Sequence, residues 1–366
     1  MQKIKLGIVG CGPIGTQAMY APILRYLENG IVTSCMDINY DNLKIMKENY
    51  GINDLYIDYD KFLSNSDMDA VIICSPTYLH EEQVIRAAEH KKHILCEKPM
   101  ARTVKECDNM IESCKKNNIK LMIALMKRFD KSFIFINELL KQKELGSVFQ
   151  AKCDWSWFDP TEINWRTRID NMGGIFQDHG SHTIDLCYWW LGEIKTVSGT
   201  IRILSENTEI EDLAVATLEH ENGAISTHMM TRNAHKALNE YYLIDGTKAS
   251  LEIQYPNYWS YYPGCTFEIK KYLKGKQSID LTQYNVRNFD FEQRNNRYKN
   301  EIDYFCKCLL NNLDPEIDGL HGRRIIEIIN AVYISSFYKE KVTLPVKENI
   351  DLKEIFRETK LKYRFK

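Results

Sequence analysis

The sequence has no long apolar run. No stretch of about 18 consecutive apolar residues occurs, so a membrane-spanning helix is not expected. The first residues, MQKIKLGIVG, also lack the apolar stretch of a signal peptide. A basic surplus is missing too, because 48 Lys and Arg stand against 50 Asp and Glu, for a formal net charge of -2. Binding a phosphate backbone needs such a surplus, so we expect no nucleic-acid partner. From the missing apolar runs we expect a cytoplasmic protein with no membrane partner.

The cysteines lack the spacing of a metal or redox motif. None of the eleven Cys belongs to a C-x-x-C pair, and Cys306 and Cys308 have the wrong spacing for a zinc knuckle. Cys35, Cys74 and Cys96 stand at the ends of apolar runs, where a thiol behaves as a small hydrophobe. We therefore expect reduced, buried thiols in a reducing compartment and no metal site.

The first 125 residues alternate short β-branched runs with amphipathic stretches. The expected strands are residues 4–9, 31–36, 70–74, 93–96 and 120–124, and the expected helices are 41–49, 81–90 and 104–117. Apolar strands separated by helices predict an α/β fold with a doubly wound parallel sheet, because crossover helices cover both faces. We interpret residues 1–127 as a Rossmann domain. Pro22 removes a backbone donor where the first helix should continue, so we expect a break there.

The pattern changes after Phe129. Alternating residues predict strands at 148–158, 195–204, 213–220, 224–230, 241–245 and 250–254, and helices are expected near 297–310 and 323–337. The total of 366 residues allows two or three domains. We interpret residues 128–345 as a C-terminal α/β domain with a large, mostly antiparallel open sheet. Residues 346–366 are expected to form a charged, peripheral tail.

A glycine-rich motif stands directly after the first strand. It fits G-x-G-x-x-G and comprises Gly10, Cys11, Gly12, Pro13, Ile14 and Gly15. The glycines allow a tight turn, close approach of a pyrophosphate and contact between helix and strand. The pyrophosphate then lies at a helix N-terminus, where free N–H groups and the helix dipole favour an anion. The motif predicts a dinucleotide site.

Asp37 ends the second strand and bears on the choice of cofactor. A carboxylate there can accept hydrogen bonds from both ribose hydroxyls. It would repel a 2'-phosphate, and Ile38 and Asn39 supply no positive charge to offset that repulsion. We therefore predict NAD rather than NADP. The alternative for Asp37 is a turn or helix-capping role.

Two further segments carry groups suited to acid–base chemistry. Glu97, Lys98 and Pro99 follow the fourth strand, where loops form the ligand crevice of a doubly wound sheet, although a surface lysine in a turn is the alternative. Farther along, Asp178, His182 and Asp185 are spaced i, i+4 and i+7, so that on a helix a carboxylate can orient an imidazole one turn away. That arrangement suits a general base. Structural histidines, or a metal site that includes His179, are the alternatives.

The glycine motif, the Glu97-Lys98-Pro99 segment and the Asp178 to His182 spacing together resemble the glucose-fructose oxidoreductase and inositol dehydrogenase family (Gfo/Idh/MocA). The resemblance extends over nearly the whole chain. It implies a Rossmann domain, a C-terminal α/β domain often used in oligomers, and NAD(P)-dependent redox chemistry on sugars or polyols. It also assigns roles: Lys98 near the reacting hydroxyl, His182 as acid/base and Asp178 as its support. Arg128 falls where members of the family often carry polar residues, so the resemblance makes it a candidate substrate contact.

The resemblance extends to cofactor contacts and to oligomers. The segment that follows the third expected strand looks like the family's, which implies cofactor contacts from Ser75, Pro76, Thr77 and His80. The resemblance implies further cofactor contacts from Glu97 and Lys98, after the fourth expected strand. It also implies a homodimer or homotetramer formed through the C-terminal sheet. Met19 and Tyr20 depart from the family, replacing a histidine frequent in its first helix.

Aromatic residues cluster before Asp178. Trp165 and Arg166 are candidate sugar contacts, because aromatic faces suit the C–H faces of a pyranose and Arg suits its hydroxyls. Trp155 and Trp157 are weaker candidates and equally suit a packed strand. A second aromatic patch, comprising Tyr255, Tyr258, Trp259, Tyr261 and Tyr262, suits either substrate or a dimer surface.

We predict an NAD-dependent oxidoreductase that transfers a hydride between nicotinamide and a secondary alcohol of a sugar, glycoside or cyclitol. In oxidation, His182 takes the hydroxyl proton and Lys98 steadies the developing alkoxide. Two alternatives stay open. One is an NAD-retaining glycosidase that acts by transient oxidation and elimination, and the other is a non-catalytic dinucleotide or sugar sensor.

Overall fold

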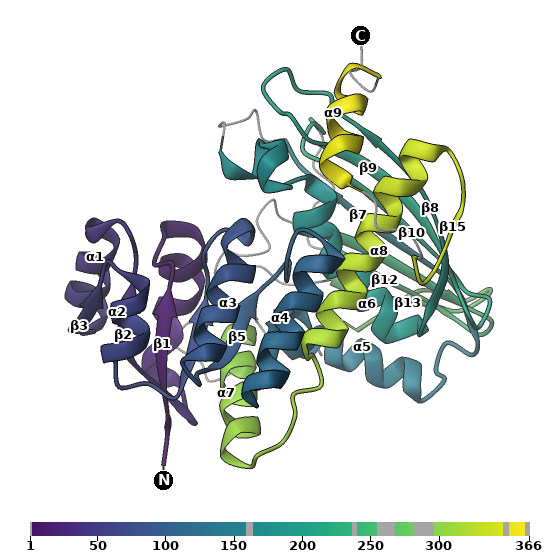
Figure 1. Cartoon of the computed structure of the whole chain (residues 1–366). Coiled ribbons are helices and arrows are strands. Elements are labelled where there is room, and N and C mark those ends of the chain that lie inside the picture. Colours follow the sequence, from purple (N-terminus) through teal and green to yellow (C-terminus); the bar gives the residue numbers. More distant parts are fainter. Residues whose placement is uncertain are drawn as a thin grey trace. The chain divides into compact units, whose positions relative to one another are not determined.

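The computed structural model describes residues 2–158, 164–235, 240–254, 268–281, 296–346 and 351–362 (Figure 1). The chain forms two compact units. The first unit comprises Met1–Phe129 and Phe291–Arg324, and the second comprises Asp130–Asp290 and Ile325–Lys366. No helix among the described residues is both long enough and apolar enough to cross a membrane.

The first unit contains a six-stranded parallel sheet in the order β3-β2-β1-β4-β5-β6. Its strands are β1 (Ile4–Val9), β2 (Gly30–Met36), β3 (Asp54–Tyr56), β4 (Ala70–Ile73), β5 (His93–Glu97) and β6 (Leu121–Ala124). Every residue of β4 and β6 is buried. This order doubles back on both sides of β1, so the predicted doubly wound sheet is confirmed.

Capping residues mark most of the ends of the first four helices of this unit. They are α1 (Tyr40–Tyr50), α2 (Tyr59–Asn65), α3 (His80–Glu89) and α4 (Val104–Asn117). Asn39, Asp58 and Thr103 accept backbone hydrogen bonds at the starts of α1, α2 and α4. Gly51 and Asn118 take the left-handed conformation after α1 and α4.

The first helix breaks near Pro22, as the sequence predicts. A π-helical segment, η1 (Pro13–Tyr20), runs directly into a 3-10 segment, η2 (Ala21–Tyr26). Pro22 lacks the N–H that an α-helix would need at this position. The chain therefore reaches β2 without a regular first helix.

A late segment of the chain returns to the first unit. Helix α7 (Arg297–Leu310) is tied to the turn before β2, because Asp303 Oδ1 accepts from the N–H groups of Glu28 at 2.9 Å and Asn29 at 2.8 Å. Lys299 Nζ lies 2.9 Å from Glu28 Oε1 and 2.8 Å from Asp303 Oδ2. The structure thus differs from the continuous 128–345 domain that we expected from the sequence.

The second unit contains a nine-stranded sheet in the order β14-β13-β12-β11-β7-β10-β9-β8-β15. Its strands are β7 (Val148–Ser156), β8 (Ile194–Arg202), β9 (Leu213–His220), β10 (Ile225–Thr231), β11 (Glu240–Gly246), β12 (Ser250–Gln254), β13 (Glu268–Tyr272), β14 (Ile279–Asp280) and β15 (Val342–Thr343). All neighbours are antiparallel except β7 and β10, which are parallel. The predicted mostly antiparallel sheet is confirmed.

Helices α5 (Lys131–Lys141), α6 (Ser181–Leu191), α8 (Gly319–Tyr338) and α9 (Leu352–Lys362) complete the fold. The core between α5, α6 and the sheet includes Phe133, Leu186, Trp190 and Tyr242. The expectation of a peripheral tail is wrong, because α9 buries Leu352, Ile355 and Phe356. The ring of Phe356 meets that of Tyr333 edge-on, with their centroids 4.9 Å apart.

Candidate active site

The glycine loop of the first unit is held against two strand ends. Gly10 has φ +84, and its N–H donates to Met36 O at 2.9 Å. A Cβ at this position would stand 2.7 Å from Ser75 N and 2.9 Å from Cys74 C. Only glycine accommodates both the left-handed backbone and this close backbone approach. The turn after β1 is therefore fixed next to the end of β4.

Gly12 differs from Gly10, because a Cβ there would meet nothing within 4 Å. Its backbone is extended, with φ -64 and ψ 164, and no described side chain caps the start of η1 that follows. The first N–H groups of η1 thus face a position that no capping side chain fills. An uncapped helix start of this kind suits an anion such as pyrophosphate.

Asp37 joins the glycine loop to the end of β2. Its Oδ2 accepts from Cys11 N–H at 2.7 Å and from Asn42 Nδ2 at 3.2 Å, and its Oδ1 accepts from Asn39 N–H at 2.7 Å. A carboxylate offers about four lone-pair positions, so these donors leave acceptor capacity for a ribose hydroxyl. The loop, the uncapped η1 and Asp37 therefore fit the pyrophosphate and ribose of NAD. The N-cap of α1 is Asn39 rather than Asp37, so Asp37 holds the turn before the helix, and its contact with the ribose stays a prediction.

Glu97 and Lys98 lie in the loop at the carboxyl end of β5. Glu97 Oε2 accepts from the backbone N–H of Lys98 at 3.0 Å, and Glu97 Oε1 accepts from Tyr20 Oη at 2.6 Å. Tyr20 is fully buried, and its hydroxyl also lies 3.5 Å from Oε2 of buried Glu301. Burial raises the pKa of Glu301, so its proton is held more firmly than in an exposed carboxyl.

Tyr20 thereby acquires a role that the sequence did not reveal. It positions Glu97, which in turn holds the backbone of Lys98. The three residues are brought together across 77 positions of sequence, so no local spacing could have indicated the contact.

His80 links the loops that follow β4 and β5. Its Nε2 lies 2.9 Å from Ser75 O, and its Nδ1 lies 3.1 Å from Pro99 O. Burial lowers the pKa of His80, although the neighbouring carbonyl oxygens act in the opposite direction. These contacts make His80 a positioning residue for both loops. Thr77 is also buried. It begins the 3-10 segment η3 (Thr77–Leu79), which leads into α3.

Arg128, a predicted substrate contact, faces residues of its own unit. Its Nη2 lies 3.2 Å from His321 Nε2, and its Nη1 lies 3.8 Å from Glu316 Oε1. The side chain is buried, so these neighbours supply a structural reason for the arginine. Its proposed contact with substrate stays a prediction.

In the second unit, two adjacent glycines form the turn before Asp178. A Cβ on Gly173 would overlap the backbone of Arg166, and a Cβ on Gly174 would overlap the carboxylate of Glu211. Gly174 also has a positive φ of +35. The glycines therefore bring Arg166 and Glu211 against the short π-helical segment η7 (Phe176–Gly180), which carries Asp178.

Asp178 is buried at the centre of a polar and aromatic cluster. Its Oδ2 accepts from Arg166 Nε at 3.0 Å and lies 3.5 Å from His179 Nδ1. The His179 ring is flanked by Trp155 and Trp157, with centroid distances of 4.6 and 4.5 Å. Asp178 thus contacts Arg166 as well as the imidazole of His179. The i, i+4 pattern, which pairs Asp178 with His182, did not predict the arginine.

His182 lies in the first turn of α6 and is 1% exposed. Its ring centroid is 6.0 Å from that of Trp155, so His182 and His179 share the same tryptophan. Asp185, one turn further along α6, is equally buried. Asp178 belongs to η7 rather than to α6, so the single regular helix expected across these residues is interrupted.

Arg166 is also stacked on its neighbour, because its guanidinium carbon lies 4.3 Å from the Trp165 ring centroid. The pair is half-buried. The second aromatic patch, at Tyr255, Tyr258, Trp259, Tyr261 and Tyr262, lies outside the described residues. Among the described residues, the donor atoms close enough to share a metal ion belong to Cys153, Cys187 and His228 rather than to His179 and His182.

Glu211 stabilises the segment η7 that carries Asp178. Glu211 was not identified from the sequence. Its Oε1 accepts from Phe176 N–H at 3.0 Å and from Tyr333 Oη at 2.9 Å. Burial raises the pKa of Glu211 to about 7, against the lowering effects of these two donors and of Arg232. Since Glu211 and Phe176 are 35 residues apart, only the fold reveals this support for η7.

Comparison with known proteins accounts for both units. Residues 4–125 match the model of an oxidoreductase family with an NAD-binding Rossmann fold. Residues 133–252 match the model of the GFO/IDH/MocA C-terminal domain. The two models together span most of both units.

Three similar proteins illustrate the relationship. The chain is 26% identical over 357 residues to the myo-inositol 2-dehydrogenase of Thermotoga maritima, covering 96% of this chain and 99% of the relative. It is 28% identical to the 2,7-anhydro-N-acetylneuraminate hydratase of Escherichia coli, covering 68% and 67% of the two chains. A crystal structure of aldose-aldose oxidoreductase from Caulobacter crescentus, complexed with glycerol, matches with a TM-score of 0.82 and 26% identity, covering 94% and 100%.

Proposed function

Because the chain belongs to the GFO/IDH/MocA family of NAD-binding oxidoreductases, we propose that it transfers a hydride between NAD and a secondary alcohol of a sugar, glycoside or cyclitol. The names of the relative from Thermotoga maritima and of the structural neighbour from Caulobacter crescentus both point to polyhydroxylated substrates. The observation that carries the proposal is the set formed by buried Asp178 and His182 and half-buried His179 beside Trp155. Such a set supplies an acid–base group and an apolar wall for a sugar ring.

In this proposal, His182 accepts the proton of the reacting hydroxyl. The neutral imidazole is the form that can act as a base. Asp178 fixes the surroundings of the imidazoles through its contacts with Arg166 and His179. Trp165 and Arg166 are proposed to contact the remaining part of the sugar.

Lys98 is proposed to stabilise the oxygen from which the proton leaves. Its ammonium can donate hydrogen bonds to a developing alkoxide. The hydrogen bonds from Tyr20 to Glu97, and from the Lys98 N–H to Glu97, hold the backbone that carries this side chain. NAD, when bound, supplies the acceptor for the hydride that leaves the carbon bearing this oxygen.

A substrate panel tests the proposal. Cyclitols, hexoses, glycosides and sugar acids are each incubated with NAD+, and NADH is followed by its absorbance. We expect one class to give turnover that the His182→Ala variant loses. Flat absorbance with every class, with no substrate consumed and with tight NAD binding, would favour the alternative of a sensor.

A second candidate is redox-assisted elimination, in which the hydride is returned and no net NADH accumulates. It is favoured by the similar proteins from Escherichia coli and Mediterraneibacter gnavus, both named 2,7-anhydro-N-acetylneuraminate hydratases. The same panel separates the two candidates when products are followed by mass spectrometry. Substrate loss without NADH supports elimination, whereas equal amounts of NADH and oxidised product support the dehydrogenase.

We further propose that the chain is cytoplasmic and forms a homodimer or homotetramer through the second-unit sheet. Apolar side chains are exposed on neighbouring strands of that sheet, including Phe149, Val215, Ile225 and Met229. Met229 and Val215 are direct cross-strand partners, so these two apolar side chains lie side by side on one face of the sheet. Light scattering after size exclusion should give a multiple of the chain mass, and Met229→Lys should lower it.

A further inference from the structure

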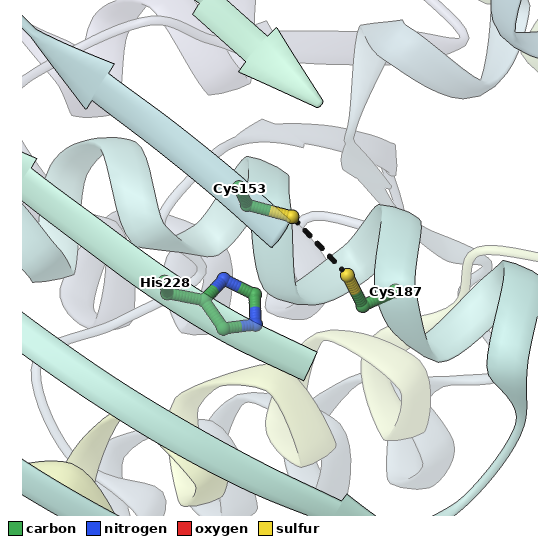
Figure 2. Close-up of side chains that lie close together, drawn as sticks. All are labelled: Cys153, Cys187 and His228. Carbon is green, nitrogen blue, oxygen red and sulfur yellow. Dashed lines mark hydrogen bonds between the residues drawn. The ribbon is translucent and has the colours of Figure 1, made fainter. Parts of the chain in front are cut away.

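Two cysteines and a histidine from three different elements meet in the core of the second unit. Cys153 lies on β7, Cys187 on α6 and His228 on β10, and Figure 2 shows their side chains turned toward one another. One donor atom from each residue lies within 4.8 Å of the other two. None of the three belongs to the acid–base cluster described above.

Their chemistry selects one class of ligand. Thiolates and imidazole are soft or borderline donors, which suit Zn²⁺ and disfavour Mg²⁺ and Ca²⁺. Cys153 and Cys187 are both 0% exposed, as is His228. A dry core penalises net charge, and two thiolates with a neutral imidazole balance the two positive charges of zinc.

The spacing of the sulfurs is close to that of a zinc site. The two Sγ atoms are 3.4 Å apart. Zinc–sulfur bonds of about 2.3 Å in a tetrahedral site place two sulfurs about 3.8 Å apart. Binding therefore requires the thiols to separate by only a few tenths of an ångström.

Surrounding hydroxyls already orient the histidine. His228 Nδ1 lies 2.9 Å from Thr183 Oγ1, and its Nε2 lies 3.2 Å from Ser226 Oγ. Ser226 Oγ also contacts His220 Nε2 at 3.1 Å. One ring nitrogen can turn to a metal while the other keeps its hydroxyl partner, which is the usual outer-shell arrangement of a ligating histidine.

We propose that Cys153, Cys187 and His228 form a structural Zn²⁺ site that fastens α6 to β7 and β10. Each thiol loses its proton when the ion binds, so binding releases two protons and leaves the bound complex neutral. Because α6 also carries His182, the ion would stabilise the helix on which the proposed base lies. The site itself takes no part in the hydride transfer.

The first test is the metal content of the protein purified under reducing conditions with zinc in the medium, measured by atomic emission after dialysis against a weak chelator. We expect roughly one zinc per chain. The Cys187→Ser variant should lose it, whereas Cys107→Ser, which alters a buried thiol of α4 in the first unit, should keep it. Absence of zinc from the reduced wild-type protein, or equal zinc in Cys187→Ser, would overturn the proposal.

A second measurement does not depend on whether a variant folds. Co²⁺ added to metal-free wild-type protein should give an intense near-ultraviolet band from sulfur-to-cobalt charge transfer, and protons should be released as the band grows. Zinc should also raise the thermal midpoint of the wild-type protein. A mass lower by two hydrogens, with no cobalt band, would mean that the pair forms a disulfide instead, and would also overturn the proposal.

Discussion

The two units assemble their functional residues in different ways. The first unit builds its loop from Gly10, Gly12 and Asp37, whose spacing is visible in the sequence. The second unit brings together Trp155, Arg166, Asp178 and Glu211 from separate segments. Their spacing in the sequence does not indicate that they lie close together. A cofactor common to many enzymes can be bound by a local motif, whereas a particular proton transfer needs side chains from several elements. The units should therefore respond differently to substitution.

The largest difference between the effect on turnover and the effect on NAD affinity is expected for a substitution of His182. Replacing it by Ala removes the proposed base and should lower turnover by about 100-fold or more, on the usual scale for general acid–base groups. NAD affinity, which we assign to the first unit, should remain nearly unchanged. Steady-state kinetics with the substrate found in the panel and a fluorescence titration of NADH measure the two quantities.

His90→Ala is the matched control, since His90 is an exposed imidazole at the end of α3. It should leave both quantities at their wild-type values. If His182→Ala weakens NADH binding as much as it lowers turnover, the assignment of separate tasks to the two units is wrong.

Glu211 should make the second unit sensitive to pH. Its pKa is raised by burial to about 7, from an unfolded value of 4.5. Between these values the native carboxyl holds a proton that the unfolded chain has lost, so the free energy of unfolding falls as pH rises from 4.5 to 7. The loss is on the order of 3 kcal/mol and is complete above the native pKa. Urea unfolding at several pH values measures it.

Glu211→Gln should remove most of that pH dependence. The amide keeps an oxygen that can accept from Phe176 N–H and Tyr333 Oη, but it does not ionise in this range. The control is Glu221→Gln in an exposed turn, which should retain the slope. An unchanged slope in Glu211→Gln would show that another group causes it.

Asp37 should affect the first unit alone. Asp37→Ala removes an ionised acceptor, and hydrogen bonds to charged groups contribute about 1.5 to 3 kcal/mol. NAD affinity should therefore fall by about 10- to 100-fold, and the preference for NAD over NADP should shrink. Asp41→Ala, at an exposed position in the first turn of α1, is the control. Undiminished discrimination against NADP in Asp37→Ala would remove Asp37 as its cause.

The same contrast explains what the sequence could predict. Strand β1 and helix α4 were predicted to the residue, because apolar runs and capping residues are local signals. Tyr20 and Glu211 were missed, since their partners lie 77 and 35 residues away and become neighbours only after folding. The proposed zinc ligands show the same limit, because Cys153, Cys187 and His228 follow no motif spacing. Local chemistry predicts elements and loops, but it does not predict contacts between elements.

The smallest change in stability is expected for a substitution of Gly12. This substitution therefore gives the clearest test of whether the glycine loop of the first unit binds the pyrophosphate. Gly12→Ala should alter the free energy of unfolding by less than about 0.5 kcal/mol, because φ is -64 and a Cβ would meet nothing within 4 Å. NAD affinity should nevertheless fall, since the methyl group would occupy the approach of the pyrophosphate. Gly10→Ala is the matched variant and should unfold more readily, because its φ is +84 and its Cβ would press on the backbone of Ser75. Thermal unfolding and NADH titration of both variants separate the two effects, and unchanged NADH binding by a stable Gly12→Ala variant would place the pyrophosphate elsewhere.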